Sequence, residues 1–134
     1  MLNWQGDQVK RHVHTAAMKG VNSIMADCVK DAKADVSVVT ALLQGSIQLR
    51  AARLLKDVVV GIWGSFGVKY ALPVELGTRP HLIRPRSKKA LYWKGAEHPV
   101  KVVHHPGTRG KPYLRPAADK NYPNLAARIR SYLK

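Results

Sequence analysis

The chain has 134 residues, a formal net charge of +15 at pH 7 and a single cysteine. A chain of this length buries about two-thirds of its unfolded surface as one domain, so it needs no disulfide, and one cysteine forms no bridge within the chain. No apolar run approaches the ~20 residues that cross a bilayer, and residues 1–12 lack the apolar stretch of a secretion signal, so we expect a soluble intracellular protein without membrane contact.

One long helix is predicted over residues 5–34. Its apolar residues, among them Val9, Val13, Ile24 and Cys28, recur at three- and four-residue steps and therefore share one helical face. No proline interrupts the pattern, and Cys28 is expected to fill a small apolar site on this face. Gly20 indicates either a bend or a close contact with a neighbouring element.

A hairpin is predicted after this helix. Thr40 is expected to cap a short helical turn that ends at Leu43. Residues 46–53 alternate as in a strand, and residues 58–63 are β-branched and more strand-like still. Residues 54–57 separate the two as a turn, which favours antiparallel pairing.

Residues 68–117 are predicted to hold both the core of the sheet and the working surface. A helical turn is expected at residues 70–76, ended by Gly77, and residues 105–112 predict a turn-rich arm because they are dense in Pro and Gly. Further extended or strand segments are expected at residues 81–84, 88–94 and 100–104.

A final helix is predicted from about Arg115 to the end, with a break or restart at Pro123. The expected fold class is α+β, with the long N-terminal helix and the C-terminal helix packed on a small, mostly antiparallel sheet. We expect a single domain over residues 1–134, with a basic loop or arm region at residues 79–115.

The sequence offers no recognisable catalytic centre. Nothing in the spacing pairs Glu75 with Glu97, and neither a phosphate-binding loop nor a nucleophile elbow is present. Adjacent histidines such as His104 and His105 would point to opposite faces of a strand, and no zinc-ligand spacing occurs. No catalytic, cofactor-binding or metal-binding residue is therefore predicted.

The positive charge is concentrated in one segment. Residues 79–115 carry ten Lys or Arg against one acid, whereas residues 1–36 carry five against four. This predicts a positive face for DNA, RNA or an acidic protein surface, the alternative being a basic surface that only keeps the chain soluble. Tyr92, Trp93 and Tyr113 are available for stacking, although alternation with charge favours a core position for Trp93. The residues expected to face a partner or DNA are Arg79, His81, Arg84, Arg86, Lys88, Lys89, Arg109 and Lys111.

Three motifs carry a family resemblance. Residues 70–78, YALPVELGT, resemble the YA-x-x-V-E-x-G-T signature of the tail-completion, or head–tail joining, proteins of lambda-like long-tailed phages, often called minor tail components. Residues 105–108 and 112–117, HPGT and PYLRPA, are similar to that family's HPGT…P-F-L-R-P-A ending, with Tyr113 where phenylalanine is usual. Residues 42–47, LLQGSI, resemble its L-x-x-S-I entry into the first strand.

The resemblance implies a structural, non-enzymatic protein of the phage neck, without a cofactor. Its expected partners are other copies of itself in a ring, the connector or head-completion protein, the tail-tube or tail-terminator protein, and DNA. Its expected location is the virion neck or tail, and the host cytoplasm during assembly. In this interpretation the turns that set the basic segment are shaped by Glu75, Gly77, Thr78, Pro106, Gly107 and Pro112.

An alternative hypothesis is a small basic nucleic-acid binder or a ribonuclease-type toxin. Catalysis would then require His81, His104 or His105 near arginines, together with Tyr92 or Tyr113.

Overall fold

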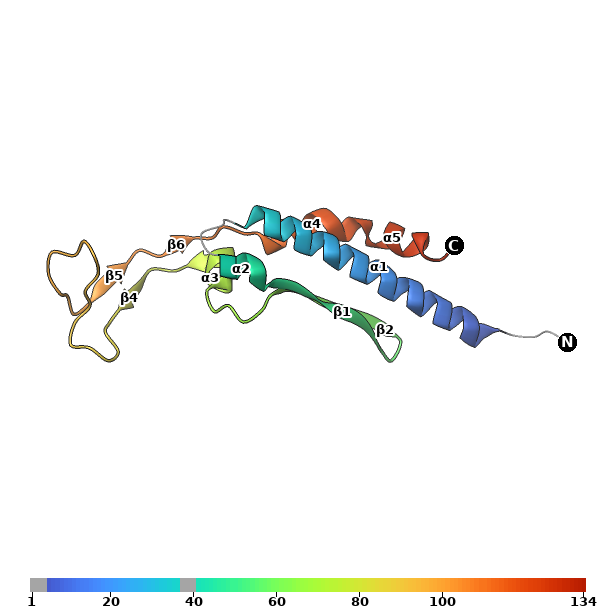
Figure 1. Cartoon of the computed structure of the whole chain (residues 1–134), viewed down its shortest axis with the longest axis horizontal. Coiled ribbons are helices and arrows are strands. Elements are labelled where there is room, and N and C mark those ends of the chain that lie inside the picture. Colours follow the sequence, from blue (N-terminus) through green and yellow to red (C-terminus); the bar gives the residue numbers. More distant parts are fainter. Residues whose placement is uncertain (1–4, 37–40) are drawn as a thin grey trace. The chain divides into compact units, whose positions relative to one another are not determined.

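A computed structural model describes residues 5–36 and 41–134, which belong to two compact units (Figure 1). Unit 1 contains the chain up to Ala71 and again from Pro112, and unit 2 is Leu72–Lys111. The predicted α+β class is confirmed by a long N-terminal helix, C-terminal helices and small antiparallel sheets. Within the described residues, the strands form three two-stranded antiparallel sheets.

The N-terminal helix of unit 1, α1, spans Gly6–Asp35 and confirms the predicted helix. Val9 and Val13 were predicted on its buried face but are 61% and 43% exposed. The turn of the hairpin lies at Lys10, whose Nζ is 2.6 Å from Asp57, so Val9 lies past the end of the hairpin. The buried residues of α1 are Ala16, Gly20, Ile24, Met25, Cys28 and Ala32.

The predicted hairpin is confirmed: β1 (Ile47–Leu55) pairs antiparallel with β2 (Val58–Ser65), and α1 packs against both strands (Figure 1). The register shifts between Arg50 and Arg53. At this bulge the Ala52 backbone N–H leaves the ladder and donates to Asn22 Oδ1 of α1 at 2.7 Å. The bulge therefore fixes the hairpin on the helix, because a buried amide requires an acceptor.

A short helix, α2 (Ala41–Ser46), leads directly into β1 and is longer than the single turn predicted there. Leu43 and Ser46 of α2 are buried, and the Ser46 carbonyl accepts a hydrogen bond of 3.0 Å from the Phe66 amide. The predicted cap at Thr40 lies outside the described residues.

The C-terminal segment of unit 1 is helical with the break expected at Pro123. It consists of α4 (Leu114–Asn121), a 3-10 turn η1 (Tyr122–Asn124) and α5 (Leu125–Ser131). A Cβ atom added at Gly20 of α1 would lie 2.5 Å from Ile129 Cγ1 of α5. Gly20 therefore marks a close helix–helix contact, which was one of the two predicted roles.

The core of the fold lies in unit 1, so the prediction that residues 68–117 hold the core of the sheet is wrong. Its largest fully buried side chains are Tyr113, Ile47 and Cys28, of which two lie outside that segment. Burial, followed by the charges of Asp27 and Asp31, raises the pKa of the Cys28 thiol to about 11. Cys28 is therefore a protonated core residue at neutral pH, as its position on the apolar face indicated.

Asp31 holds α4 against α1 and leads to a testable pH dependence. Asn121 Nδ2 donates to Asp31 Oδ2 at 2.7 Å, and Lys120 Nζ lies 3.1 Å from the same oxygen. These hydrogen bonds lower the pKa of Asp31 below its usual value. A lowered pKa stabilises the fold above the unfolded-state value of about 3.9, and this contribution is lost as the pH falls through the folded-state value.

We therefore expect Asp31→Asn to unfold at lower urea concentration than the parent at pH 7, and the difference to be smaller at pH ~3, below the unfolded-state value. Urea titrations followed by far-UV circular dichroism at the two pH values test this. An equal difference at both would show that the carboxylate charge makes no contribution.

In unit 2 the chain runs out and back as an antiparallel ribbon. After α3 (Ala71–Leu76), β3 (Gly77–Thr78) pairs with β6 (Thr108–Arg109), and β4 (His81–Ile83) pairs with β5 (Val103–His105). The predicted strand at residues 88–94 is wrong: among the described residues, this segment pairs only through an isolated bridge between Leu91 and Val100. An alternating segment forms a strand only where a neighbouring backbone supplies hydrogen bonds along its length. Here the neighbouring backbone supplies them at one position, Leu91.

Candidate interaction surface

The two Gly-Thr-Arg turns, separate in the sequence, pair with each other. Gly77 lies opposite Arg109 and Thr78 opposite Thr108 in an antiparallel arrangement. The two threonine hydroxyls share a hydrogen bond of 3.0 Å across a separation of 30 residues, and the Thr108 amide also donates to Thr78 Oγ1. Most of the predicted turn-rich arm at residues 105–112 therefore belongs to this ribbon, with its turn at Gly107.

The glycines of these turns are required by both backbone angle and space. Gly77 has φ +79° and Gly107 has φ +86°, in the left-handed region that side chains disfavour. A Cβ at Gly77 would lie 2.4 Å from the Thr108 carbonyl oxygen, and one at Gly107 would lie 2.3 Å from the Thr78 carbonyl oxygen. Each turn thus places its glycine against the threonine carbonyl oxygen of the other turn.

The paired Gly-Thr-Arg turns are here called the crossing of the ribbon. Next to this crossing, two histidines stack across the ribbon. The rings of His81 and His105 are 4.9 Å apart between centroids and inclined by 27°. His81 Nδ1 donates to the Arg79 carbonyl at 2.9 Å, and His105 Nδ1 accepts from the Gly107 amide at 3.0 Å. Each ring therefore commits one nitrogen to the backbone of the Gly-Thr-Arg turns.

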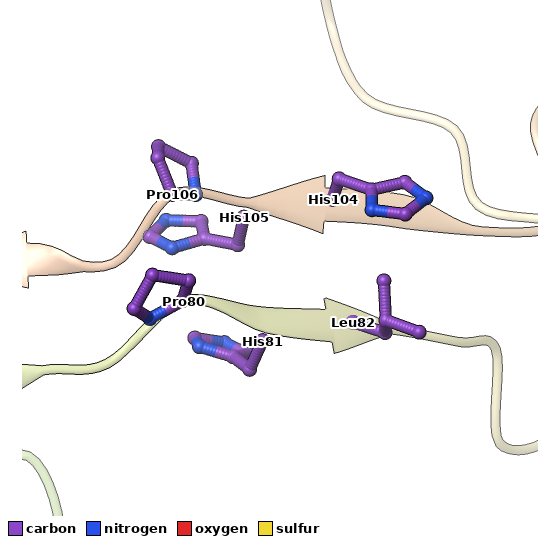
Figure 2. A pocket seen from close by; sticks show the side chains of 6 residues that line it. All are labelled: Pro80, His81, Leu82, His104, His105 and Pro106. Atoms are coloured by element: carbon purple, nitrogen blue, oxygen red, sulfur yellow. The ribbon is translucent and has the colours of Figure 1, made fainter.

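An open groove of about 370 Å³ lies at this histidine pair (Figure 2). Its lining supplies imidazole rings and apolar surface, with no carboxylate or thiol among the residues that form it. Face-to-face stacking also leaves no room for a substrate between the two rings. The groove is lined by Pro80, His81, Leu82, His104, His105 and Pro106.

The predicted partner-facing residues lie on the surface of unit 2. Unit 2 carries nine Lys or Arg against two acids, Glu75 and Glu97. Of its cations, none forms an ion pair with any described residue. Those predicted to face a partner, together with His81, are all exposed: Arg79, His81, Arg84, Arg86, Lys88, Lys89, Arg109 and Lys111.

The residues predicted to shape the turns lie where the ribbon begins and crosses. Glu75 is half-buried in α3, and the Val74 carbonyl next to it accepts a hydrogen bond of 2.7 Å from the Lys111 amide. Pro106 precedes the Gly107 turn, and Pro112 is the first residue of the returning part of unit 1.

The aromatic residues proposed for stacking have different environments from those expected. Trp93, predicted in the core, is 50% exposed, because the strand that would have buried it does not form. Tyr113, offered as a stacking residue, is only 1% exposed and belongs to the core of unit 1. Of these three aromatic residues, Tyr92 and Trp93 are therefore the two that are accessible, and both lie in unit 2.

Sequence reasoning missed the mutual pairing of the turns and the histidine stack. The signal available was the repetition of Gly-Thr-Arg itself, each copy next to a proline-bounded basic run. Three residues alone do not establish that two copies meet, since their contact depends on the path of the chain between them.

Over residues 5–36 and 41–134, no group of three or more His, Cys, Asp or Glu side chains is arranged to hold a metal ion. In the same residues no helix has both the length and the apolarity to cross a bilayer. Comparisons with known protein families, with curated proteins and with solved structures found no match to this chain.

Proposed function

We propose that the chain is a head–tail joining protein of a long-tailed phage, a non-enzymatic ring subunit between the head connector and the tail tube. The observation that carries this proposal is the role of the motif residues on which the resemblance rests. Several of them are core residues of unit 1 or turn residues of unit 2. A signature that specifies a shape is what a structural family would retain.

The motif residues divide between the two units accordingly. In unit 1 they include core residues, with Ile47 fully buried and Tyr113 and Ala117 each 1% exposed. In unit 2 they form the crossing of the ribbon through Gly77, Thr78, Gly107 and Thr108.

The exposed cations of unit 2 then act by charge complementarity. Unpaired surface cations attract an acidic protein surface or DNA, and complementary charge selects the correct partner and speeds its encounter. In the proposed ring, the ribbon meets a neighbouring neck protein, DNA, or both.

Charge reversal tests this proposal. Heads and tails produced without this protein are mixed with the purified chain, and infectious particles are counted. We expect loss of joining on the order of 100-fold or more, because like charges across an interface cost several kcal/mol. The variant replaces with glutamate the residues Arg84, Arg86, Lys88 and Lys89.

A matched control makes the same change of charge at exposed cations of unit 1. Joining by this control should stay near the parent level, and both variants should retain the parent circular dichroism spectrum. Normal joining by the unit 2 variant, or its unfolding, would count against the proposal. The control residues are Lys19, Lys69, Arg130 and Lys134.

The ribonuclease hypothesis has less support from the geometry. Two of the three histidines it names, His81 and His105, are stacked on each other, and Tyr113, one of its two tyrosines, is buried. Incubation with RNA decides between the two: cleavage that is lost in His81→Ala or His105→Ala would favour the toxin.

A further inference from the structure

The far end of the ribbon in unit 2 is a closed loop, here called the tip loop, formed by residues 91–100. The Leu91 amide donates to the Val100 carbonyl at 2.8 Å and the Val100 amide donates back at 3.0 Å. Inside the loop, the Ala96 amide donates to the Trp93 carbonyl at 3.0 Å, and Gly95 has φ +100°. The loop thus has a defined turn directly after its two aromatic residues.

The tip loop exposes two large aromatic side chains. Tyr92 is 67% exposed and Trp93 is 50% exposed. Burying such rings is worth more than burying most side chains, so adjacent exposed rings indicate a surface that a partner covers.

The surroundings of these rings identify the chemistry of that partner. Lys88, Lys89, Lys94 and Lys101 lie in the tip loop or within three residues of it, and Glu97 is the only acid there. All four lysines are exposed and none is paired with a described acid. A partner that offers both negative charge and flat apolar faces fits this combination.

We propose that the tip loop binds single-stranded nucleic acid, with Tyr92 and Trp93 stacking on unpaired bases and the lysines contacting phosphates. A positive surface beside exposed aromatic rings is the arrangement by which proteins bind single strands without sequence preference. Duplex DNA satisfies the lysines but offers no free base faces to the rings. The inference goes beyond the joining function and does not depend on it.

The test uses the purified full chain and a fluorescently labelled oligothymidylate of ~15 nucleotides, followed by fluorescence anisotropy across salt concentrations. We expect Trp93→Ala and Tyr92→Ala each to weaken binding about tenfold or more, with the salt dependence unchanged. Trp93→Phe, which retains a stacking ring, should stay within about threefold of the parent. Tyr132→Ala, an exposed aromatic change in unit 1, is the matched control and should have no effect.

The lysines give a second, independent readout. Replacing Lys88, Lys89 and Lys94 with glutamine should lower the slope of log affinity against log salt by about 2, since each single-strand phosphate contact contributes about 0.7. The same replacement at Lys19, Lys69 and Arg130 should leave the slope unchanged.

Three results would overturn the inference. The first is unchanged affinity in Trp93→Ala and Tyr92→Ala, and the second is binding to a duplex of the same length as tightly as to the single strand. The third is absence of oligonucleotide binding together with binding to vesicles that contain anionic lipid, which would assign the rings and lysines to a membrane surface. None of these assays uses heads or tails, so their failure is distinct from failure of the joining proposal.

Discussion

Replacing Tyr113 with alanine is expected to destabilise unit 1 by about 3–5 kcal/mol, the range for truncating a large buried aromatic side chain. Tyr113 directly precedes α4 and is 1% exposed, and its hydroxyl shares a hydrogen bond of 2.7 Å with Ser65 Oγ at the end of β2. It therefore ties the start of the C-terminal helices to the end of the hairpin. Urea titration followed by far-UV circular dichroism measures the loss.

Tyr113→Phe separates packing from hydrogen bonding at the same site. The ring stays and the hydroxyl is lost together with its bond to Ser65, so we expect a cost of about 1 kcal/mol. Phenylalanine is also the residue that the family resemblance leads one to expect here, so this variant should fold. If the alanine variant were as stable as the phenylalanine variant, the ring would not be a core element.

Replacing Gly107 with alanine is expected to disrupt the crossing of the ribbon in unit 2, at a cost of about 2–4 kcal/mol. The left-handed φ of +86° is strained for alanine, and the new Cβ would lie 2.3 Å from the Thr78 carbonyl oxygen. Backbone atoms cannot rotate away as a side chain can, so the strands must separate. Hydrogen exchange at the Thr108 and Lys111 amides, both bonded across the ribbon, should show loss of protection.

Gly77→Ala should have a similar effect, because a Cβ there would lie 2.4 Å from the Thr108 carbonyl oxygen. The matched control is Gly95→Ala in the tip loop, where φ is +100° but no atom lies within 4 Å of the added Cβ. The Gly95→Ala variant therefore has the strain of a left-handed φ without the contact between the added Cβ and a backbone oxygen. Equal loss of amide protection in all three variants would mean that the close approach of the turns contributes nothing.

The helices and the hairpin were predictable because their signals are local. The spacing of apolar residues, as from Ile24 to Cys28, predicts a helix from neighbouring residues alone. The β-branched run at residues 58–63 predicts a strand in the same way. Pro123 breaks a helix because it lacks an amide hydrogen, whatever surrounds it. Residues 88–94 show the limit, since their alternation predicted a strand for which the chain supplies almost no partner.

The candidate surface was predicted only in part. The concentration of charge at residues 79–115 is a property of the sequence and located the exposed cations of unit 2 correctly. Tyr113 was predicted to be available for stacking and Trp93 to lie in the core, and the structure shows the reverse for both. Burial depends on which distant segment covers a side chain, and the local pattern does not contain that information.

By itself the sequence determined the long helix, the hairpin, the glycine turns and the positive segment, each of which rests on neighbouring residues. Only the tertiary structure decided that the two Gly-Thr-Arg turns meet, that His81 stacks on His105, and that Tyr92 and Trp93 stand exposed on the tip loop. The physical reason is that backbone angles and periodicity are local preferences, whereas pairing between residues 30 apart depends on the course of the whole chain between them.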